Sequence, residues 1–367
     1  MNPRTKINII GIIFSGIVLW FGYSIHSHFF DNEKKDNLAA NQGSQIVQVD
    51  GQQISVKGES DEEENTAKET EKKNDSCSGS IISSELFMEN PDAPRKDEEF
   101  GNHYVGARSA VAIDSDTGTI LFDQNSKQRM AIASLTKMMT AVLVMENIEN
   151  LEKEVIVIDQ ETLQTEGTVI GCPRSGYCIS NRLRVGEKIS ARSLLEAMLM
   201  NSANDAAVAL GKHIAGSEKN FAKMMNEKAK ELGLQDTNFC NPSGLDEDDN
   251  PGGCYSTAYD LARISAYSLK YETIWNIMQG EEKDIYSVDG QISHHIINTD
   301  LLIDQMPNCI GGKTGFTYEA GKSLMTAAHH PYDKNKNVIA VILDDNQRWQ
   351  DMKDLMDWVF SAYDWPN

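Results

Sequence analysis

A serine and a lysine stand three residues apart, at Ser134 and Lys137, where an apolar stretch with helical spacing begins. At this spacing two side chains on a helix share one face and can contact each other. A serine hydroxyl is a weak nucleophile that needs a neighbouring base, and a neutral lysine amine can take its proton. Alone, the pair is more typical of a serine that caps an ordinary amphipathic helix.

Two later motifs carry polar side chains suited to the same chemistry. Ser202-Ala203-Asn204 separates two apolar helical stretches, 193–200 and 205–214, and a polar turn in such a place typically faces a cleft. Lys313-Thr314-Gly315 lies in an expected strand that continues into Phe316. Taken singly, the first is more typical of a helix cap and the second of an edge strand. The three patterns each occur once, in this order, so they are considered together.

Strands and helices are both expected around these motifs. Apolar runs near both ends of the region after residue 104 predict strands, and Asp289-Gly290 predicts a hairpin turn. Between about 146 and 280 the spacing is helical, and Thr257 with Asp260 resembles a helix capping box. We therefore predict an α/β (α+β) fold, with one antiparallel sheet flanked by helices and an inserted helical subdomain. The expected strands are 109–113, 119–122, 285–288, 292–296, 310–316, 323–328 and 338–343, and a last amphipathic helix covers 349–360.

The three motifs and their neighbours resemble the D-alanyl-D-alanine carboxypeptidase family, the low-molecular-mass penicillin-binding proteins. The resemblance covers about residues 105–345 and implies a β-lactamase/transpeptidase-like fold with a five-stranded antiparallel sheet. It also implies a serine peptidase that removes the terminal D-alanine from peptidoglycan stem pentapeptides, with β-lactams as covalent inhibitors. One departure from the family is an insertion at 171–178, expected at a rim of the cleft. The resembling stretches are 133–140, 202–206, 241–245, 255–260 and 312–317.

The resemblance assigns the reacting groups to Ser134, Lys137 and Ser202. Ser134 would attack the carbonyl of the penultimate D-alanine, and Lys137 would accept the serine proton. Lys137 can act as a base only when it is neutral, and burial together with the charge of Lys313 would lower its pKa. Ser202 would pass the proton on to the departing D-alanine.

The same resemblance assigns substrate binding to Asn204, Lys313, Thr314, Gly315 and Phe316. Asn204 would hydrogen-bond the substrate peptide and help to fix the catalytic lysine. Lys313 and Thr314 suit a terminal carboxylate, one by its charge and the other by its hydroxyl. Gly315 would let the substrate backbone approach as an added strand. The backbone N–H of Phe316, with that of the catalytic serine, would form the oxyanion hole.

Charge and cysteine spacing limit the other partners. A formal net charge of −21 argues against nucleic acid, because phosphate contacts require clustered lysine and arginine side chains. The six cysteines form no C-x-x-C pair, and His294-His295 lacks the spacing of zinc ligands. We therefore expect no metal ion, and the resemblance implies no other cofactor.

Four segments are expected along the chain. Residues 1–6 are basic and should stay in the cytoplasm. Residues 7–28 form an apolar run long enough to cross a bilayer as a retained signal anchor, and a cleavable signal peptide is the main alternative. In residues 29–100 acidic side chains outnumber basic ones, which predicts a disordered tether. Residues 101–367 would then form the penicillin-binding catalytic domain on the outer side of the cell membrane.

The six cysteines are expected to form two local disulfides. An outward-facing domain permits disulfides, and pairs close in sequence meet most readily. We therefore predict the bridges Cys172–Cys178 and Cys240–Cys254, and we leave Cys77 and Cys309 unpaired. The alternative is six reduced thiols.

Three other functions would use the same motifs. A D,D-endopeptidase acting on cross-links needs the same groups, so only substrate assays separate it from a carboxypeptidase. A β-lactamase of class A would use an additional glutamate for deacylation, and the candidate, Glu231, lies at the end of an expected helix. A non-catalytic wall-binding module would not be labelled covalently by penicillin, and the complete set of polar motif residues argues against it.

Overall fold

The computed structural model describes residues 90–173, 177–247, 250 and 252–366, which belong to one compact unit of the chain. The expected cytoplasmic segment 1–6, the expected anchor 7–28 and the expected tether up to residue 89 lie outside these residues, as does Cys77. Within the described part, none of the helices combines the length and the apolar character needed to span a membrane.

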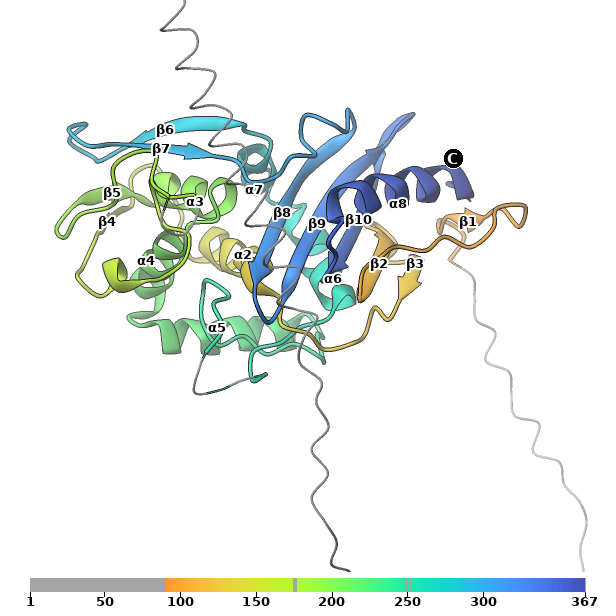
Figure 1. Cartoon of the computed structure of the whole chain (residues 1–367), viewed down its shortest axis with the longest axis horizontal. Helices are drawn as coiled ribbons and strands as arrows, with labels where there is room; N and C mark the ends of the chain where they lie inside the picture. Colours follow the sequence, from red (N-terminus) through yellow and green to blue (C-terminus); the bar gives the residue numbers. More distant parts are fainter. Residues whose placement is uncertain (1–89, 174–176, 248–249, 251, 367) are drawn as a thin grey trace, which may run out of the picture. The chain divides into compact units, whose positions relative to one another are not determined.

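A five-stranded antiparallel sheet forms the centre of the described unit, as predicted, with the strand order β3-β2-β10-β9-β8 (Figure 1). β8 carries the Lys313-Thr314-Gly315 motif and pairs with β9 on one side only, so the motif lies on an edge of this sheet. The strands are β2 Ser109–Asp114, β3 Ile120–Gln124, β8 Cys309–Thr317, β9 Gly321–His330 and β10 Asp333–Leu343.

Alternate residues of the sheet pack against helices on its two faces (Figure 1). In β10, Ile342 belongs to the core under α8 (Arg348–Ala362). Its neighbour Val341 belongs to the core that includes α2 (Lys137–Asn147) and α6 (Ala258–Ser268). Successive side chains of a strand point to opposite faces, so a strand covered on both faces has a continuous apolar sequence.

The insertion between β3 and β8 is mostly helical, as the spacing predicts. Before three of its helices, Ser190, Ser217 or Thr257 accepts a hydrogen bond from a backbone N–H of the first turn. The predicted hairpin around Asp289-Gly290 is also present, as β6 (Glu282–Tyr286) and β7 (Ser293–Ile297). The other helices of this region are α3 Ala191–Met200, α4 Asn204–Ala215, α5 Glu218–Glu231 and α7 Glu272–Met278.

Several short elements were not predicted. Ser134 lies in a 3₁₀ turn, η1 (Ala133–Thr136), and the α-helix begins only at Lys137. Two-stranded pairs join β1 to β11 and β4 to β5, and each strand has only two or three residues. Such strands are too short to show a period of two, and the first pair joins opposite ends of the unit. These elements are β1 Arg95–Lys96, β4 Val155–Val157, η2 Thr162–Gln164, β5 Lys188–Ser190 and β11 Tyr363–Asp364.

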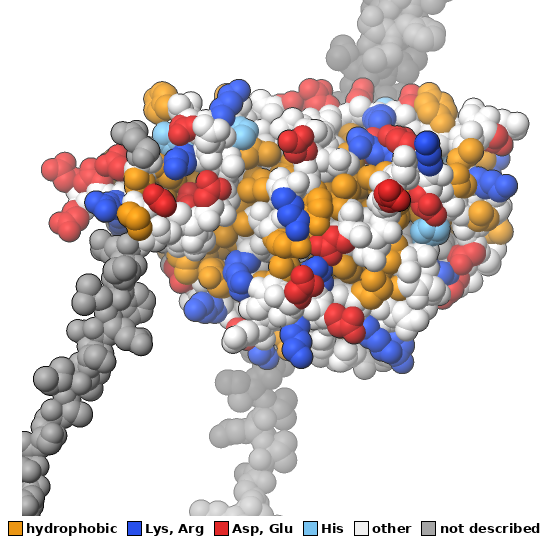
Figure 2. All heavy atoms as spheres, turned by 180° about the vertical axis from the view of Figure 1, so that it is seen from behind, with side chains coloured by type: hydrophobic (Ala, Val, Ile, Leu, Met, Phe, Trp, Pro, Cys, Tyr) orange, Lys and Arg blue, Asp and Glu red, His pale blue; other side chains and the backbone are white. Residues whose placement is uncertain are grey.

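The face turned away in Figure 1 carries both signs of charge, with hydrophobic side chains exposed between them (Figure 2). Elsewhere on the described surface, aromatic side chains are exposed where β8 leads into β9. Phe316 is 55% exposed and Tyr318 is 99% exposed, and their rings lie 5.8 Å apart. An aromatic rim therefore follows directly after the Lys313 motif.

Candidate active site

Two glycines fix the turn that carries Ser134. Ala133, just before it, has a φ of 47°, which residues other than glycine rarely adopt. Gly244 lies behind this turn with a φ of 81°, and a Cβ there would be 1.9 Å from the Ala133 carbonyl oxygen. A Cβ on Gly315 of β8 would be 3.1 Å from the carbonyl oxygen of Ile132. A loop and a strand thus contact the turn from different elements. Only glycine fits at position 244, whereas a Cβ at position 315 would be a tight contact.

Lys137 is fully buried, and its amine contacts the Ser134 hydroxyl. Its Nζ lies 2.7 Å from Ser134 Oγ, 2.7 Å from Asn204 Oδ1 and 2.6 Å from the Ser243 carbonyl oxygen. The amide and carbonyl oxygens can only accept, whereas the hydroxyl can donate or accept. A neutral amine therefore gives its two hydrogens to Asn204 and Ser243 and turns its lone pair towards the Ser134 hydroxyl.

The surroundings of Lys137 favour this neutral form. Burial holds the pKa of Lys137 well below its ordinary value of 10.5, and the positive charge of Lys313 lowers that pKa further. The buried carboxyl of Asp205 acts in the opposite direction. The sequence-based expectation that burial and Lys313 lower the pKa of this lysine agrees with the structure.

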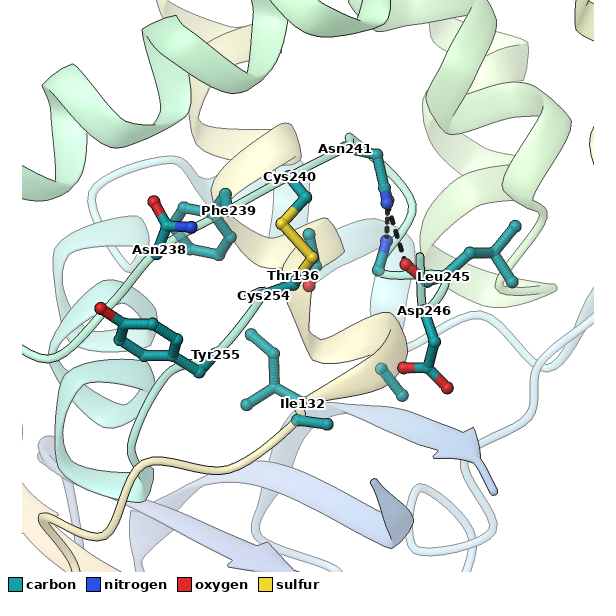
Figure 3. Close-up of a pocket in the computed structure, with 13 residues that line it drawn as sticks. Ile132, Thr136, Asn238, Phe239, Cys240, Asn241, Leu245, Asp246, Cys254 and Tyr255 are labelled. Atoms are coloured by element: carbon teal, nitrogen blue, oxygen red, sulfur yellow. Dashed lines mark hydrogen bonds between the residues drawn. A yellow bond between two sulfur atoms is a disulfide. The ribbon is translucent and has the colours of Figure 1, made fainter. Parts of the chain in front are cut away.

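The Ser243 carbonyl was not among the predicted site residues. It belongs to a turn in which Asn241 Oδ1 accepts hydrogen bonds from the backbone N–H groups of Ser243 and Gly244, at 3.2 and 2.8 Å. Asn241 Nδ2 donates to the Leu245 carbonyl at 2.9 Å (Figure 3). The sequence Asn-Pro-Ser-Gly signals such a turn. It does not show that the turn meets Lys137, which lies more than 100 positions earlier.

Ser202 lies between α3 and α4, as predicted, and Asn204 is the first residue of α4. A preceding segment of the chain holds both residues in place. Ser202 has a φ of 57°, an uncommon conformation that often marks functional sites. Asn204 Nδ2 donates to the Glu166 carbonyl at 2.8 Å, and Thr168 Oγ1 donates to the Ser202 carbonyl at 2.8 Å. With its Nδ2 occupied in this way, the Asn204 side chain presents Oδ1 to Lys137.

Lys313 lies on the other side of Ser202. Its Nζ donates to Ser202 Oγ at 2.9 Å and to the Thr314 carbonyl at 3.1 Å. Burial lowers the pKa of Lys313 to about 7, while the nearby Asp300 carboxyl acts to raise it. The Thr314 hydroxyl lies 2.7 Å from that of Thr299. An amine and a hydroxyl from adjacent residues are thus each held by a hydrogen bond, and both groups are suited to binding a carboxylate.

Asp300 and Arg348 support β8 and were also not predicted. Burial raises the pKa of Asp300 to about 6, although the charges of Lys313 and Arg348 oppose that change. A Cβ on Gly312 would lie 2.4 Å from Asp300 Oδ2, so glycine lets this carboxyl lie against the strand. Arg348 donates to the Gly315 carbonyl at 2.9 Å. Neither residue stands in a recognisable pattern, because each is an isolated charge next to an apolar element.

The structure brings the predicted site residues into two connected groups. Ser134, Lys137 and Asn204 form one group, and Ser202, Lys313 and Thr314 form the other. The charge of Lys313 acts on Lys137, which links the two. Gly315 lies against the turn of the first group, and Phe316 is the half-exposed residue that follows it along β8.

Both predicted disulfides are present, Cys172–Cys178 and Cys240–Cys254. Cys309 is free among the described residues, also as expected, and burial raises its pKa to about 12. In the described part, one group of metal-ligating atoms lies within 4.8 Å, and it consists of Cys240, Glu247 and Cys254. Two of its three members are joined as a disulfide and cannot offer thiolate ligands.

The glutamate considered for a β-lactamase is a helix terminus. Glu231 is the last residue of α5, and its carboxylate pairs with Lys228 of the same helix at 2.7 Å. Its side chain is 63% exposed, in a surface ion pair. It therefore resembles an ordinary helix end rather than a group on a catalytic loop, as the sequence indicated.

Known proteins resemble this chain in sequence. Residues 96–347 match the model of the peptidase S11 family, described as D-alanyl-D-alanine carboxypeptidase. The chain is 37% identical over 261 residues to the D-alanyl-D-alanine carboxypeptidase DacF of Bacillus subtilis, an alignment that covers 70% of this chain and 63% of that protein. It is 32% identical to a D-alanyl-D-alanine endopeptidase of Pseudomonas aeruginosa, over 60% of this chain and 66% of that protein.

The fold is also found in solved structures. Penicillin-binding protein D2 of Listeria monocytogenes, solved in an ampicillin-bound form, is 30% identical with a TM-score of 0.58. That comparison covers 71% of this chain and the whole of the other. The chain spans about two thirds or less of the length of the curated relatives named above. Since the family model matches more than half of its residues, the chain belongs to the peptidase S11 family of D-alanyl-D-alanine carboxypeptidases.

Proposed function

We propose that this chain is a serine D-Ala-D-Ala carboxypeptidase that removes the terminal D-alanine from peptidoglycan stem pentapeptides through an acyl-enzyme on Ser134. One observation carries the proposal: the Lys137 amine lies 2.7 Å from the Ser134 hydroxyl, and its other two partners can only accept. A buried amine in this setting can take a proton from serine at neutral pH. Family membership supports the substrate class.

In the proposed acylation, Ser134 Oγ forms a bond to the carbonyl carbon of the penultimate D-alanine, and its proton passes to Lys137 Nζ. The oxyanion of the tetrahedral intermediate is bound by the backbone N–H groups of Ser134 and Phe316, by resemblance to the family. The peptide C–N bond then breaks. Ser202 transfers a proton from Lys137 to the departing amine, and the contact of its Oγ with Lys313 supports an orientation suited to that transfer.

The substrate is proposed to bind along the edge of β8. An extended peptide can pair with the free edge of this strand. Its terminal carboxylate would meet Lys313 Nζ and the Thr314 hydroxyl, which are both buried and held in place. A bound carboxylate would favour the charged form of Lys313 and raise its pKa from about 7.

Release of the acyl group completes the proposed cycle. Water attacks the ester carbonyl, Lys137 accepts its proton, and the proton returns to Ser134 Oγ as the C–O bond breaks. A β-lactam would acylate the same serine, and the ampicillin-bound relative from Listeria monocytogenes supports this. In a β-lactam the leaving amine stays attached to the acyl group, so we expect its release by water to be slow.

The decisive assay uses the full chain in detergent with a pentapeptide that ends in D-Ala-D-Ala. Release of free D-alanine, together with labelling of Ser134 by a fluorescent penicillin, is the expected result. A cross-linked dimeric peptide tests the endopeptidase alternative, which the relative from Pseudomonas aeruginosa supports. Rapid turnover of penicillin would indicate a β-lactamase, and a failure to label Ser134 would refute the acyl-enzyme.

We also propose that residues 7–28 anchor the chain in the cell membrane, with the residues from 29 up to β1 as a tether and the catalytic domain outside. The expected bound of the tether at residue 100 is too late, because Arg95–Lys96 of β1 pair with β11. The apolar run and the acidic stretch of the sequence support this arrangement. The two disulfides are compatible with an oxidising compartment. Sequencing the mature N-terminus from the native host tests the anchor, and a terminus near Ala40 would show a cleaved signal instead.

A further inference from the structure

The Cys240–Cys254 disulfide lies beside the loop that contacts Lys137. Cys240 directly precedes Asn241, which organises the turn, and Cys254 ends the acidic stretch that follows the turn. The disulfide faces the same pocket as Thr136, at the end of the 3₁₀ turn of Ser134 (Figure 3). That pocket, about 10 Å³ in volume, has room for about one water molecule. The disulfide therefore lines a small pocket together with Ala133 and Thr136, two residues of the 3₁₀ turn that carries Ser134.

The turn meets the catalytic elements through its backbone. The Ser243 carbonyl accepts from Lys137 Nζ at 2.6 Å, and the preceding carbonyl, of Pro242, accepts from Thr140 Oγ1 of α2 at 2.7 Å. Gly244 touches the carbonyl of Ala133, where no Cβ would fit. Because these contacts are made by main-chain atoms and a glycine, they depend on the path of the loop.

After the turn, the described part of the loop makes few hydrogen bonds to the rest of the fold, and one of them joins Asn238 Nδ2 to the Gly253 carbonyl at 2.7 Å. The backbone bonds there are local, such as the N–H of Asn250 to the Glu247 carbonyl at 3.0 Å. Beyond the disulfide the base of the loop is well held, since Asn238 and Tyr255 exchange two backbone hydrogen bonds at 2.8 and 3.0 Å. Before the turn, the Asn226 side chain bonds the backbone C=O and N–H of Phe239 at 2.7 and 2.8 Å. The disulfide adds a covalent cross-link between Cys240, the residue before the turn, and Cys254 at the end of the loop.

We propose that the Cys240–Cys254 disulfide is a positioning element for the catalytic lysine. It holds the Asn241–Leu245 turn so that the Ser243 carbonyl meets Lys137 Nζ and water stays away from the amine. This inference rests on the proposed acyl-enzyme chemistry of Ser134. Without the disulfide the turn moves away, water reaches the amine, and Lys137 is neutral only at higher pH.

The direction of that change follows from the groups around Lys137. Burial is the largest influence on its pKa, and loss of burial moves the pKa upward towards 10.5. The charges that face it are Lys313 on β8, which lowers the pKa, and Asp205 on α4, which raises it. Lys313 and Asp205 do not belong to the loop, so their charges still act on Lys137 when the disulfide is removed.

The test compares two double variants of the full chain, each lacking one disulfide. In Cys240→Ser/Cys254→Ser we expect the rise of the penicillin acylation rate with pH to move upward by about one unit, which lowers the rate about tenfold at any pH on the lower part of that rise. The matched control, Cys172→Ser/Cys178→Ser, loses a bridge whose cysteines make no hydrogen bond to the Asn241–Leu245 turn in the described structure, and its rise should stay at the wild-type pH. An unshifted rise in the first variant, or an equal shift in both, overturns the proposal.

Chemical reduction gives a second test that does not depend on folding without the cysteines. In the Cys172→Ser/Cys178→Ser background, dithiothreitol converts the remaining bridge to two thiols and is itself oxidised to its cyclic disulfide. The acylation rate should fall on reduction and recover on reoxidation, and a constant rate contradicts the proposal. Labelling of the oxidised wild type at Ser134 is measured first. If that labelling fails, the proposed function fails, whereas normal labelling with no effect of reduction refutes only this inference.

Discussion

Two buried lysines, Lys137 and Lys313, stand on either side of Ser202, and their surroundings suit opposite charge states. Lys137 has one hydroxyl partner and two partners that can only accept, and burial keeps its pKa well below 10.5. Lys313 also has a hydroxyl and a carbonyl partner, and its pKa lies at about 7. A buried carboxyl acts to raise the pKa of each lysine, Asp205 for Lys137 and Asp300 for Lys313, whereas the positive charge of Lys313 lowers the pKa of Lys137. Both lysines are buried, so their different neighbours must give them different roles. Lys137 is the proposed base, and Lys313 is the proposed cation that binds the carboxylate.

The largest effect is expected from Lys137→Arg. Arginine keeps the positive charge but cannot give up its proton, so the proposed base is lost. The acylation rate should fall by about 10²–10⁴-fold, the usual contribution of general base catalysis. Stopped-flow labelling with a fluorescent penicillin measures it, and near-normal acylation would argue against a lysine base.

The same change at the second lysine separates the two roles. Arginine also binds carboxylates, so Lys313→Arg should retain more activity than Lys313→Ala. The alanine variant loses a charge-assisted hydrogen bond, which corresponds to a fall in kcat/KM of about 10- to 100-fold. Equal loss of D-alanine release in the arginine and alanine variants would contradict the proposal that the positive charge of Lys313 binds the substrate carboxylate.

The difference between the two lysines also depends on Asp300, which affects the pKa of Lys313. Its carboxylate acts to raise the pKa of Lys313, so Asp300→Asn should lower that pKa below about 7. Lys313 then loses its charge at a lower pH, and the rise of KM with increasing pH should begin earlier than in the wild type. Steady-state assays from pH 5 to 9 measure this shift. An unchanged KM profile would show that Asp300 does not control the charge of Lys313.

The smallest effect is expected from Thr299→Val. The change removes the hydroxyl that lies 2.7 Å from that of Thr314, while the shape of the side chain is kept. A neutral hydrogen bond contributes about 1 kcal/mol, so KM should rise about fivefold while kcat changes little. The opposite pattern, a fall in kcat at constant KM, would place Thr314 in the chemical step.

The sequence predicted the groups that react better than the groups that hold them. The three motifs contain all the side chains that hydrogen-bond to Lys137 or Lys313, because each motif is a short local pattern of the sequence. Thr299, which contacts the Thr314 hydroxyl, lies outside them. Asp300, Arg348 and the Ser243 carbonyl were missed, since each acts on a residue brought near by the fold. The sheet and the long helices were predicted because their apolar periods are long, whereas strands of two or three residues leave no period to detect.

The most direct test of the central proposal is the rate of acylation of the wild-type chain by a β-lactam, measured from pH 5 to 11 in single-turnover experiments. The two lysines interact, so the profile should show two apparent pKa values that belong to the pair. The rate should rise with an apparent pKa well below 10.5, as Lys137 becomes neutral, and it should fall again as Lys313 loses its charge. A rate that rises only near pH 10.5, the ordinary pKa of a lysine, would contradict the proposal of a neutral Lys137 as the base.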